Sequence, residues 1–193
     1  STTKACTAAM IATLAKEGRL AWDQPAVELW PSFAMPTDEL TKRTRLSDLL
    51  SMRTGLQSTE AQLMLYGADS TPISTLETLA QIPVAAPLGE QFIYQDQAYA
   101  AAGYLATMAG DRKSPDLNSN YAALMQERVF QPIGMDTAII ADDLTTVSDD
   151  YATPYALDAT GQVLPVDYLP IAGYVPAGGL AASITDLARF VQW

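Results

Sequence analysis

Apolar residues recur at helical spacing along most of this chain. Near its start, Cys6, Met10 and Leu14 fall at positions i, i+4 and i+8, which places them on one face of a helix expected over residues 2–17. Gly18 is a natural C-terminal stop for that helix. Helices with one apolar face have to bury those faces against one another. The pattern therefore predicts a helix-rich fold with little strand.

Caps and stops indicate further helices. Ser47 is expected to cap a short helix that closes at Gly55. Ser74 and Glu77 have the spacing of a capping box, which predicts a helix that ends before Pro83.

Two longer helices are expected over residues 97–109 and 119–130, and a final one is capped by Ser183 or Thr185. The pattern changes after residue 136. There, residues 151–169 indicate two strands around a Thr160-Gly161 turn.

Composition excludes several classes of function. The chain carries 11 Lys and Arg against 22 Asp and Glu, a net charge of −11 that repels phosphate backbones, so no nucleic-acid partner is expected. No apolar stretch reaches membrane-spanning length. With one cysteine and no histidine, the chain offers no disulfide and no zinc, haem or iron–sulfur ligand set, and we expect neither metal nor cofactor. A carboxylate site for Mg²⁺ or Ca²⁺ stays open, although no EF-hand spacing occurs.

The opening residues STTK place Ser1 and Lys4 one helical turn apart, on one face of the helix. A lysine amine in a desolvated pocket can act as a base toward the serine hydroxyl. Unpaired N–H groups at the helix start favour negative charge that develops nearby. The alternative is a serine that caps the helix and a lysine that is simply solvated.

Tyr94 and Asp96 stand between a Pro-x-Gly turn and the helix expected at residues 97–109. A tyrosine here can hydrogen-bond the serine and carry a proton to a leaving group. Structural alternatives exist for both residues. Tyr94 can be a half-buried aromatic side chain, and Asp96 can be an ordinary N-cap.

Five blocks, in order, resemble the serine β-lactamases and penicillin-binding-protein-like hydrolases. The resemblance points to the branch with class C β-lactamases, D-alanyl-D-alanine carboxypeptidases and β-lactamase-fold esterases. The blocks cover essentially all 193 residues, and they are STTK with GRLAWDQPAVELWPSF, RLSDLLSMRTGL, PLGEQFIYQDQAYAAAGYL, VFQPIGMDTA and PAGGLAASITDLARF.

The resemblance implies an α+β fold, of which this chain holds mainly the helical part. It also implies that Ser1 is the nucleophile, that Lys4 and Tyr94 are its proton-transfer partners, and that Asp96 occupies a substrate-binding asparagine position. The reaction would pass through an acyl-enzyme on Ser1, with the Ser1 backbone N–H as half of an oxyanion hole. An ester, a β-lactam or a D-amino-acid peptide would be the substrate, and a periplasmic or secreted location is typical of the family.

The chain departs from the family pattern at Asp96. An ionised carboxylate cannot donate to a substrate carbonyl, and it stabilises the charged form of Lys4, which weakens that amine as a base. This departure ranks ester hydrolysis first among the reactions.

A third motif, Lys-Thr-Gly or His-x-Gly on a core strand, is also absent, as are most core strands. We therefore expect one β-lactamase-like domain over residues 1–193, truncated at both ends, with a helical region to about residue 135 and a mixed region after it. This segment would need the missing N- and C-terminal parts of the fold, in the same chain or as another chain.

Two other classes of function stay open. One is a catalytically inactive relative that binds a peptide or partner in its cleft, which Asp96 favours. The other is an N-terminal-nucleophile hydrolase that uses a free Ser1 amine as its base. The usual fold of that class is a four-layer αββα sandwich, which the helix-rich pattern disfavours.

Overall fold

The computed structural model describes residues 1–61, 69–110 and 114–193. Its elements follow in chain order. They are α1 (Thr3–Lys16), α2 (Ala26–Leu29), α3 (Asp38–Arg43), α4 (Leu46–Leu50), α6 (Pro72–Glu77), the 3₁₀-helix η2 (Thr78–Gln81), α7 (Asp96–Ala109), α8 (Leu117–Met125), the π-helix η3 (Gln126–Phe130), α9 (Gln131–Ile133), β1 (Ile139–Ile140), the 3₁₀-helix η4 (Leu144–Thr146), β2 (Tyr155–Leu157), β3 (Val163–Pro165), α10 (Val175–Gly178), β4 (Leu180–Ala181) and α11 (Ile184–Gln192).

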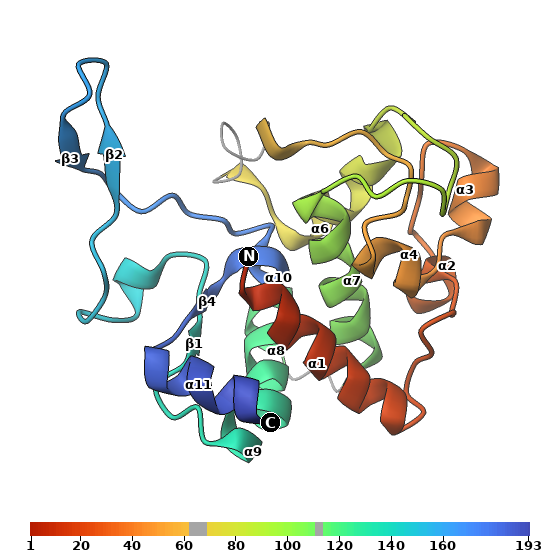
Figure 1. The fold of residues 1–193 in the computed structure, drawn as a ribbon. Coiled ribbons are helices and arrows are strands. Elements are labelled where there is room, and N and C mark those ends of the chain that lie inside the picture. The colour runs from red at the N-terminus through yellow and green to blue at the C-terminus, as the bar shows by residue number, and fades with distance from the viewer. Residues whose placement is uncertain (62–68, 111–113) are drawn as a thin grey trace.

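Helix α7 is the centre of the core, and α1, α4, α6, α8 and α10 pack around it (Figure 1). Its residues from Gln97 to Thr107 are all buried. Five of these eleven residues are alanines, whose small side chains let neighbouring helices come close. At Gly103 an added Cβ would lie 2.3 Å from Pro176 Cβ of α10, so these two helices are in close contact.

Helix α1 starts and stops as its sequence predicts. Gly18 adopts φ +72°, and the N–H groups of Gly18 and Arg19 donate to the carbonyls of Ala15 and Leu14 at 3.0 Å each. These two bonds form a Schellman motif, which satisfies carbonyls that the helix end leaves free. The Ser183 side chain accepts from Asp186 N–H and caps α11, so of the two predicted candidates, Ser183 and Thr185, it is Ser183 that forms the cap.

Two predicted caps are wrong. Helix α4 begins after Arg45, not Ser47, and the Asp48 side chain accepts from the Arg45 N–H at 2.9 Å. Helix α6 begins after Thr71, which forms its capping box with Ser74. At α4 the N–H groups of Leu46 and Ser47 donate to the carbonyls of Gln24 and Trp22, and this tertiary pairing fixes where the helix begins. At α6 a second capping residue, Thr71, lies one turn before Ser74 and takes the cap.

The predicted helix over residues 119–130 is three elements. Asp116 caps α8 by accepting from the N–H groups of Asn118 and Ser119, so the helix begins earlier than predicted. The backbone then widens into the π-turn η3 and continues into α9, which ends at Gly134 with φ +71°.

The strands form two antiparallel ribbons. In one, β1 pairs with β4, with Ile139 opposite Ala181. In the other, β2 and β3 form the hairpin predicted around Thr160-Gly161, with Leu157 opposite Val163, and it projects away from the helices (Figure 1). The described part of the chain is therefore helix-rich with few short strands, as predicted. Within it, no helix is long and apolar enough to cross a membrane.

Candidate active site

The first turn of α1 is held against the α10–β4 segment. The Leu180 N–H donates to Thr3 Oγ1 at 3.0 Å, and Thr7 Oγ1 donates to the Pro176 carbonyl at 2.7 Å. Ser1 lies just before this turn, and its side chain does not cap the helix, whose N-cap residue is Thr2. The capping alternative for Ser1 is therefore wrong.

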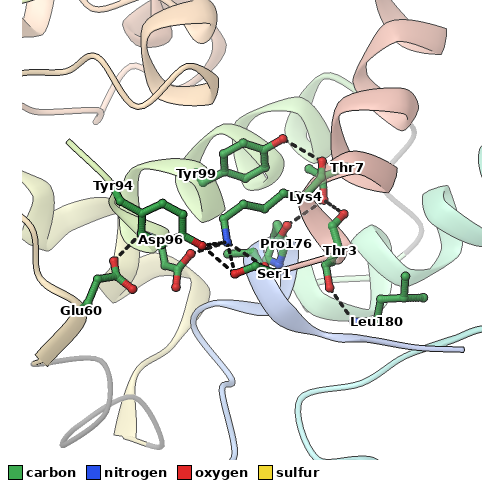
Figure 2. Close-up of polar contacts among 11 residues, drawn as sticks. Ser1, Thr3, Lys4, Thr7, Glu60, Tyr94, Asp96, Tyr99, Pro176 and Leu180 are labelled. Atoms are coloured by element: carbon green, nitrogen blue, oxygen red, sulfur yellow. Dashed lines mark hydrogen bonds and ion pairs between the residues drawn. The ribbon is translucent and has the colours of Figure 1, made fainter. Parts of the chain in front are cut away.

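Ser1, Lys4 and Tyr94 form a closed triangle of hydrogen-bond contacts (Figure 2). Lys4 Nζ lies 3.0 Å from Ser1 Oγ and 2.9 Å from Tyr94 OH, and the two hydroxyl oxygens are 2.6 Å apart. Lys4 is not solvated, since its side chain is only 11% exposed. Tyr94 and Ser1 are exposed, so the triangle is buried on the lysine side and open on the hydroxyl side.

Three further contacts orient Lys4. Its Nζ donates to the Ala177 carbonyl of α10 at 3.1 Å, and it forms an ion pair with the Asp96 carboxylate at the start of α7. The Tyr99 hydroxyl donates to the Lys4 backbone carbonyl at 2.7 Å. Burial raises the pKa of Tyr99 to about 12, so this hydroxyl keeps its proton and remains a donor at neutral pH.

Asp96 is 14% exposed, and it is the first residue of α7 after the N-cap residue Gln95. Its carboxylate lies on the Lys4 side of the site, and its backbone N–H donates to Glu60 Oε1 at 2.8 Å (Figure 2). Burial, together with the neighbouring Asp96 carboxyl group, raises the pKa of Glu60 to about 7.

The structure thus brings together all four site residues predicted from the sequence. It adds Glu60, the Ala177 carbonyl and Tyr99, which sequence analysis missed. Ala177 lies in the PAGGL block, so its place near the site had a signal in the sequence. Glu60 had none, because its contact with Asp96 spans 36 residues.

The arrangement can move a proton away from a serine hydroxyl, because that hydroxyl contacts both an amine and a phenol. The described residues include no group of three or more His, Cys, Asp or Glu side chains that could hold a metal ion. A cavity of about 390 Å³ is lined by Gln57, Thr78, Gln97 and Tyr174 among others. None of the four predicted residues lines it, so the serine faces an open surface and not this cavity.

This helix-rich arrangement is that of the β-lactamase-like fold. The model of the Beta-lactamase family matches residues 1–193, and the chain belongs to that family, as its motifs predicted.

Known relatives are longer than this chain. Unguisins hydrolase ungD of Aspergillus violaceofuscus (strain CBS 115571) is 28% identical over 205 residues, which cover 100% of this chain and 35% of that protein. The chain therefore spans about a third of the curated relative that it matches.

Two solved structures share the fold. An octameric penicillin-binding protein homologue from Pyrococcus abyssi superposes with a TM-score of 0.76 at 23% identity, over 99% of this chain and 43% of that one. A D-stereospecific amidohydrolase from Streptomyces sp. superposes with a TM-score of 0.80 at 18% identity, over 100% of this chain and 58% of that one. The chain thus corresponds to the helix-rich part of the β-lactamase-like fold, as predicted.

Proposed function

We propose that this chain supplies the nucleophile and the proton-transfer groups of an acyl-serine hydrolase. Ser1 Oγ attacks the carbonyl carbon of the substrate, and its proton passes to the Lys4–Tyr94 pair. The bond to the leaving group then breaks, the leaving group takes the proton, and an acyl ester remains on Ser1. Water hydrolyses this ester and restores the serine. The observation that carries the proposal is the closed triangle, with all three contacts between 2.6 and 3.0 Å.

The solvent exposure of the Ser1, Lys4 and Tyr94 side chains indicates the path of the proton. Lys4 is enclosed, and three of its neighbours are oxygen atoms of Ser1, Tyr94 and Asp96. Tyr94 is 39% exposed, so its hydroxyl contacts Ser1 and also faces the open side of the site. A leaving group on that side can take its proton from Tyr94, while Lys4 stabilises negative charge on the phenol.

An ester is the first substrate class that this site supports. The Asp96 carboxylate stands where the family's asparagine would donate to a substrate amide, and its partner is Lys4. Esters have better leaving groups than amides, so they depend less on a donor at this position. β-Lactams and D-amino-acid peptides are the alternative substrates.

We further propose that residues 1–193 belong to one β-lactamase-like domain and work together with other parts of the fold. The covered shares of the solved relatives, 43% and 58%, support this proposal. Those other parts would supply the third motif and the second oxyanion donor.

A second candidate is a catalytically inactive protein that binds a ligand at the open surface beside Ser1 and Tyr94. The observation that favours it is the Lys4–Asp96 ion pair, because the Asp96 carboxylate occupies one contact of the amine that the reaction would use. The N-terminal-nucleophile alternative does not fit the fold, because its αββα sandwich is not the β-lactamase-like arrangement of this chain.

Labelling of the full-length protein with a fluorophosphonate tests the proposal. We expect mass spectrometry to locate the adduct on Ser1, and Ser1→Ala to abolish it. Lys4→Met should slow labelling by roughly 10²–10⁴-fold, the usual contribution of a general base. Ser51→Ala, at an exposed serine outside the Ser1–Lys4–Tyr94 triangle, is the matched control and should label normally at Ser1. A wild-type protein that is not labelled at Ser1 would favour the inactive binding protein.

A further inference from the structure

Glu60 is hydrogen-bonded to Asp96, the first residue of α7. It accepts from the Asp96 N–H at 2.8 Å, and nearby the Gln95 side-chain amide donates to the Gln57 carbonyl at 2.7 Å. The N-cap residue of α7, Gln95, forms no side-chain capping bond of its own. Glu60 therefore takes over this role, with its carboxylate near the positive end of the helix dipole.

Two carboxyl groups, those of Asp96 and Glu60, lie near the single positive charge of Lys4. Lys4 is the cation in contact with Asp96, and Glu60 adds a second carboxyl group behind that pair (Figure 2). Among the described residues, the ionisable groups that act on Glu60 or respond to it are Asp96, Lys4 and Tyr174. With a pKa of about 7, Glu60 changes its charge in the neutral pH range.

We propose that Glu60 is a positioning residue of the serine site, which fixes Asp96 and sets the amount of negative charge behind Lys4. The inference rests on the proposed role of Ser1. It goes further, because it assigns a function to a residue outside the Ser–Lys–Tyr triangle. Asp96 is the link, since it contacts Glu60 through its backbone N–H and Lys4 through its carboxylate.

The direction of the effect does not depend on which group acts as the base. Ionised Glu60 adds negative charge near Lys4, and negative charge opposes the loss of a proton from Ser1, Lys4 or Tyr94 alike. Protonated Glu60 leaves a single carboxylate, that of Asp96, to balance the Lys4 cation. Proton removal from the triangle is therefore easier when Glu60 is neutral.

The test compares Glu60→Gln with wild type in the full-length protein. Glutamine keeps an oxygen that can accept from the Asp96 N–H but cannot ionise. The measurement is the second-order rate constant of Ser1 labelling by a fluorophosphonate between pH 5 and 10. We expect the acidic limb of the Glu60→Gln profile to move to lower pH by roughly one unit, with the plateau within about threefold of wild type. Glu60→Leu, which also removes the acceptor, should lower the plateau.

A second readout does not need catalysis. The pKa of Glu60 is raised from 4.5 to about 7 on folding, so the folded state holds its proton more strongly than the unfolded state does. This contribution to stability is complete below pH 4.5 and is lost as the pH rises to about 7. The urea midpoint of wild type should therefore fall relative to that of Glu60→Gln across this range.

The two proposals fail in different ways. Superimposable pH profiles of wild type and Glu60→Gln, in a protein that labels at Ser1, would overturn the role of Glu60 alone. An equal loss of plateau in Glu60→Gln and Glu60→Leu without a shift of the limb would do the same, because it indicates a purely structural role. Absence of Ser1 labelling in wild type would overturn the proposed function, and this inference with it.

Discussion

Lys4 has more hydrogen-bond acceptors than it has protons. As an ammonium group it carries three N–H donors. Four oxygen atoms surround it, from Ser1, Tyr94, Ala177 and Asp96. If Lys4 loses one proton, it gains a lone pair, and only the hydroxyls of Ser1 and Tyr94 can donate to it. Hydrogen bonds from the Ser1 and Tyr94 hydroxyls therefore stabilise a neutral Lys4 amine, whereas the Asp96 carboxylate stabilises a charged one.

Replacement of Asp96 by asparagine should change substrate preference. The amide can donate to a substrate carbonyl, and it no longer stabilises the Lys4 cation as a carboxylate does. We expect kcat/KM for an amide relative to an ester to rise by roughly tenfold, about the contribution of one hydrogen bond. Steady-state assays of the full-length protein with matched p-nitrophenyl ester and p-nitroanilide substrates would measure this ratio.

Asp96→Ala is the control for that experiment. It removes the carboxylate without supplying a donor, so it separates the charge effect from the hydrogen bond. An equal rise of the amide-to-ester ratio in Asp96→Ala would show that the donor plays no part.

Sequence motifs located part of the candidate site, and their limit has a physical reason. Ser1 and Lys4 are local partners in one helical turn, and Tyr94 and Asp96 flank a turn and a helix start, so short patterns suffice for them. Glu60 reaches the site through a contact that depends on how two distant segments pack. No local spacing encodes such a contact.

At the scale of elements, the approach of α7 to α10 fixes the lysine side of the site. Gly103 of α7 faces Pro176, and the next residue, Ala177, provides the carbonyl that accepts from Lys4. An alanine at 103 would place its Cβ 2.3 Å from Pro176 Cβ and 3.3 Å from Thr7 Cγ2. Real Cβ atoms do not come so close, so the two helices would have to separate.

Gly103→Ala should therefore destabilise the protein. In a helix, alanine is more favourable than glycine by about 1 kcal/mol, but overpacking typically costs about 1–3 kcal/mol. Because the Pro176 ring is bonded to the backbone and cannot turn away, we expect a cost near the upper end of that range. We expect a lower urea midpoint and slower fluorophosphonate labelling of Ser1, because α10 carries the Ala177 carbonyl. A variant as stable as wild type would contradict the tight α7–α10 contact.

The helices that sequence analysis located best are those with a single strong stop or cap. Gly18 has no nearby competitor and ends α1 as predicted, whereas α11 is capped by Ser183, one of the two candidates that the sequence offered. The cap of α4 was misplaced because the N–H groups of Leu46 and Ser47 donate to the carbonyls of Gln24 and Trp22, more than 20 residues away, and these tertiary contacts fix where the helix begins. The π-turn η3 was also missed, since its sequence has the same apolar spacing as an ordinary helix.

At the scale of the molecule, apolar side chains remain exposed outside the helical core. On α11, Ile184 is 81% exposed and Val191 is 83% exposed, and the β2–β3 hairpin exposes Leu157 and Val163 as well. Single exposed apolar residues are common on protein surfaces, but neighbouring ones such as the paired Leu157 and Val163 usually mark a contact surface. Residues 1–193 by themselves should consequently be less stable than the same residues in the full-length protein.

Cys6 provides a direct measure of that difference. Its side chain is fully buried, and burial raises the pKa of its thiol to about 11, so at pH 8 it is both inaccessible and protonated. We expect a thiol reagent to label the folded full-length protein at least about a hundredfold more slowly than the same protein in about 6 M urea. The segment 1–193 alone should become reactive at a lower urea concentration.

A Ser51→Cys variant in a Cys6→Ala background, whose cysteine is exposed in both proteins, controls for the reagent itself. Equal urea midpoints for Cys6 labelling in the two proteins would show that the exposed faces of α11 and the hairpin contribute nothing to stability when covered.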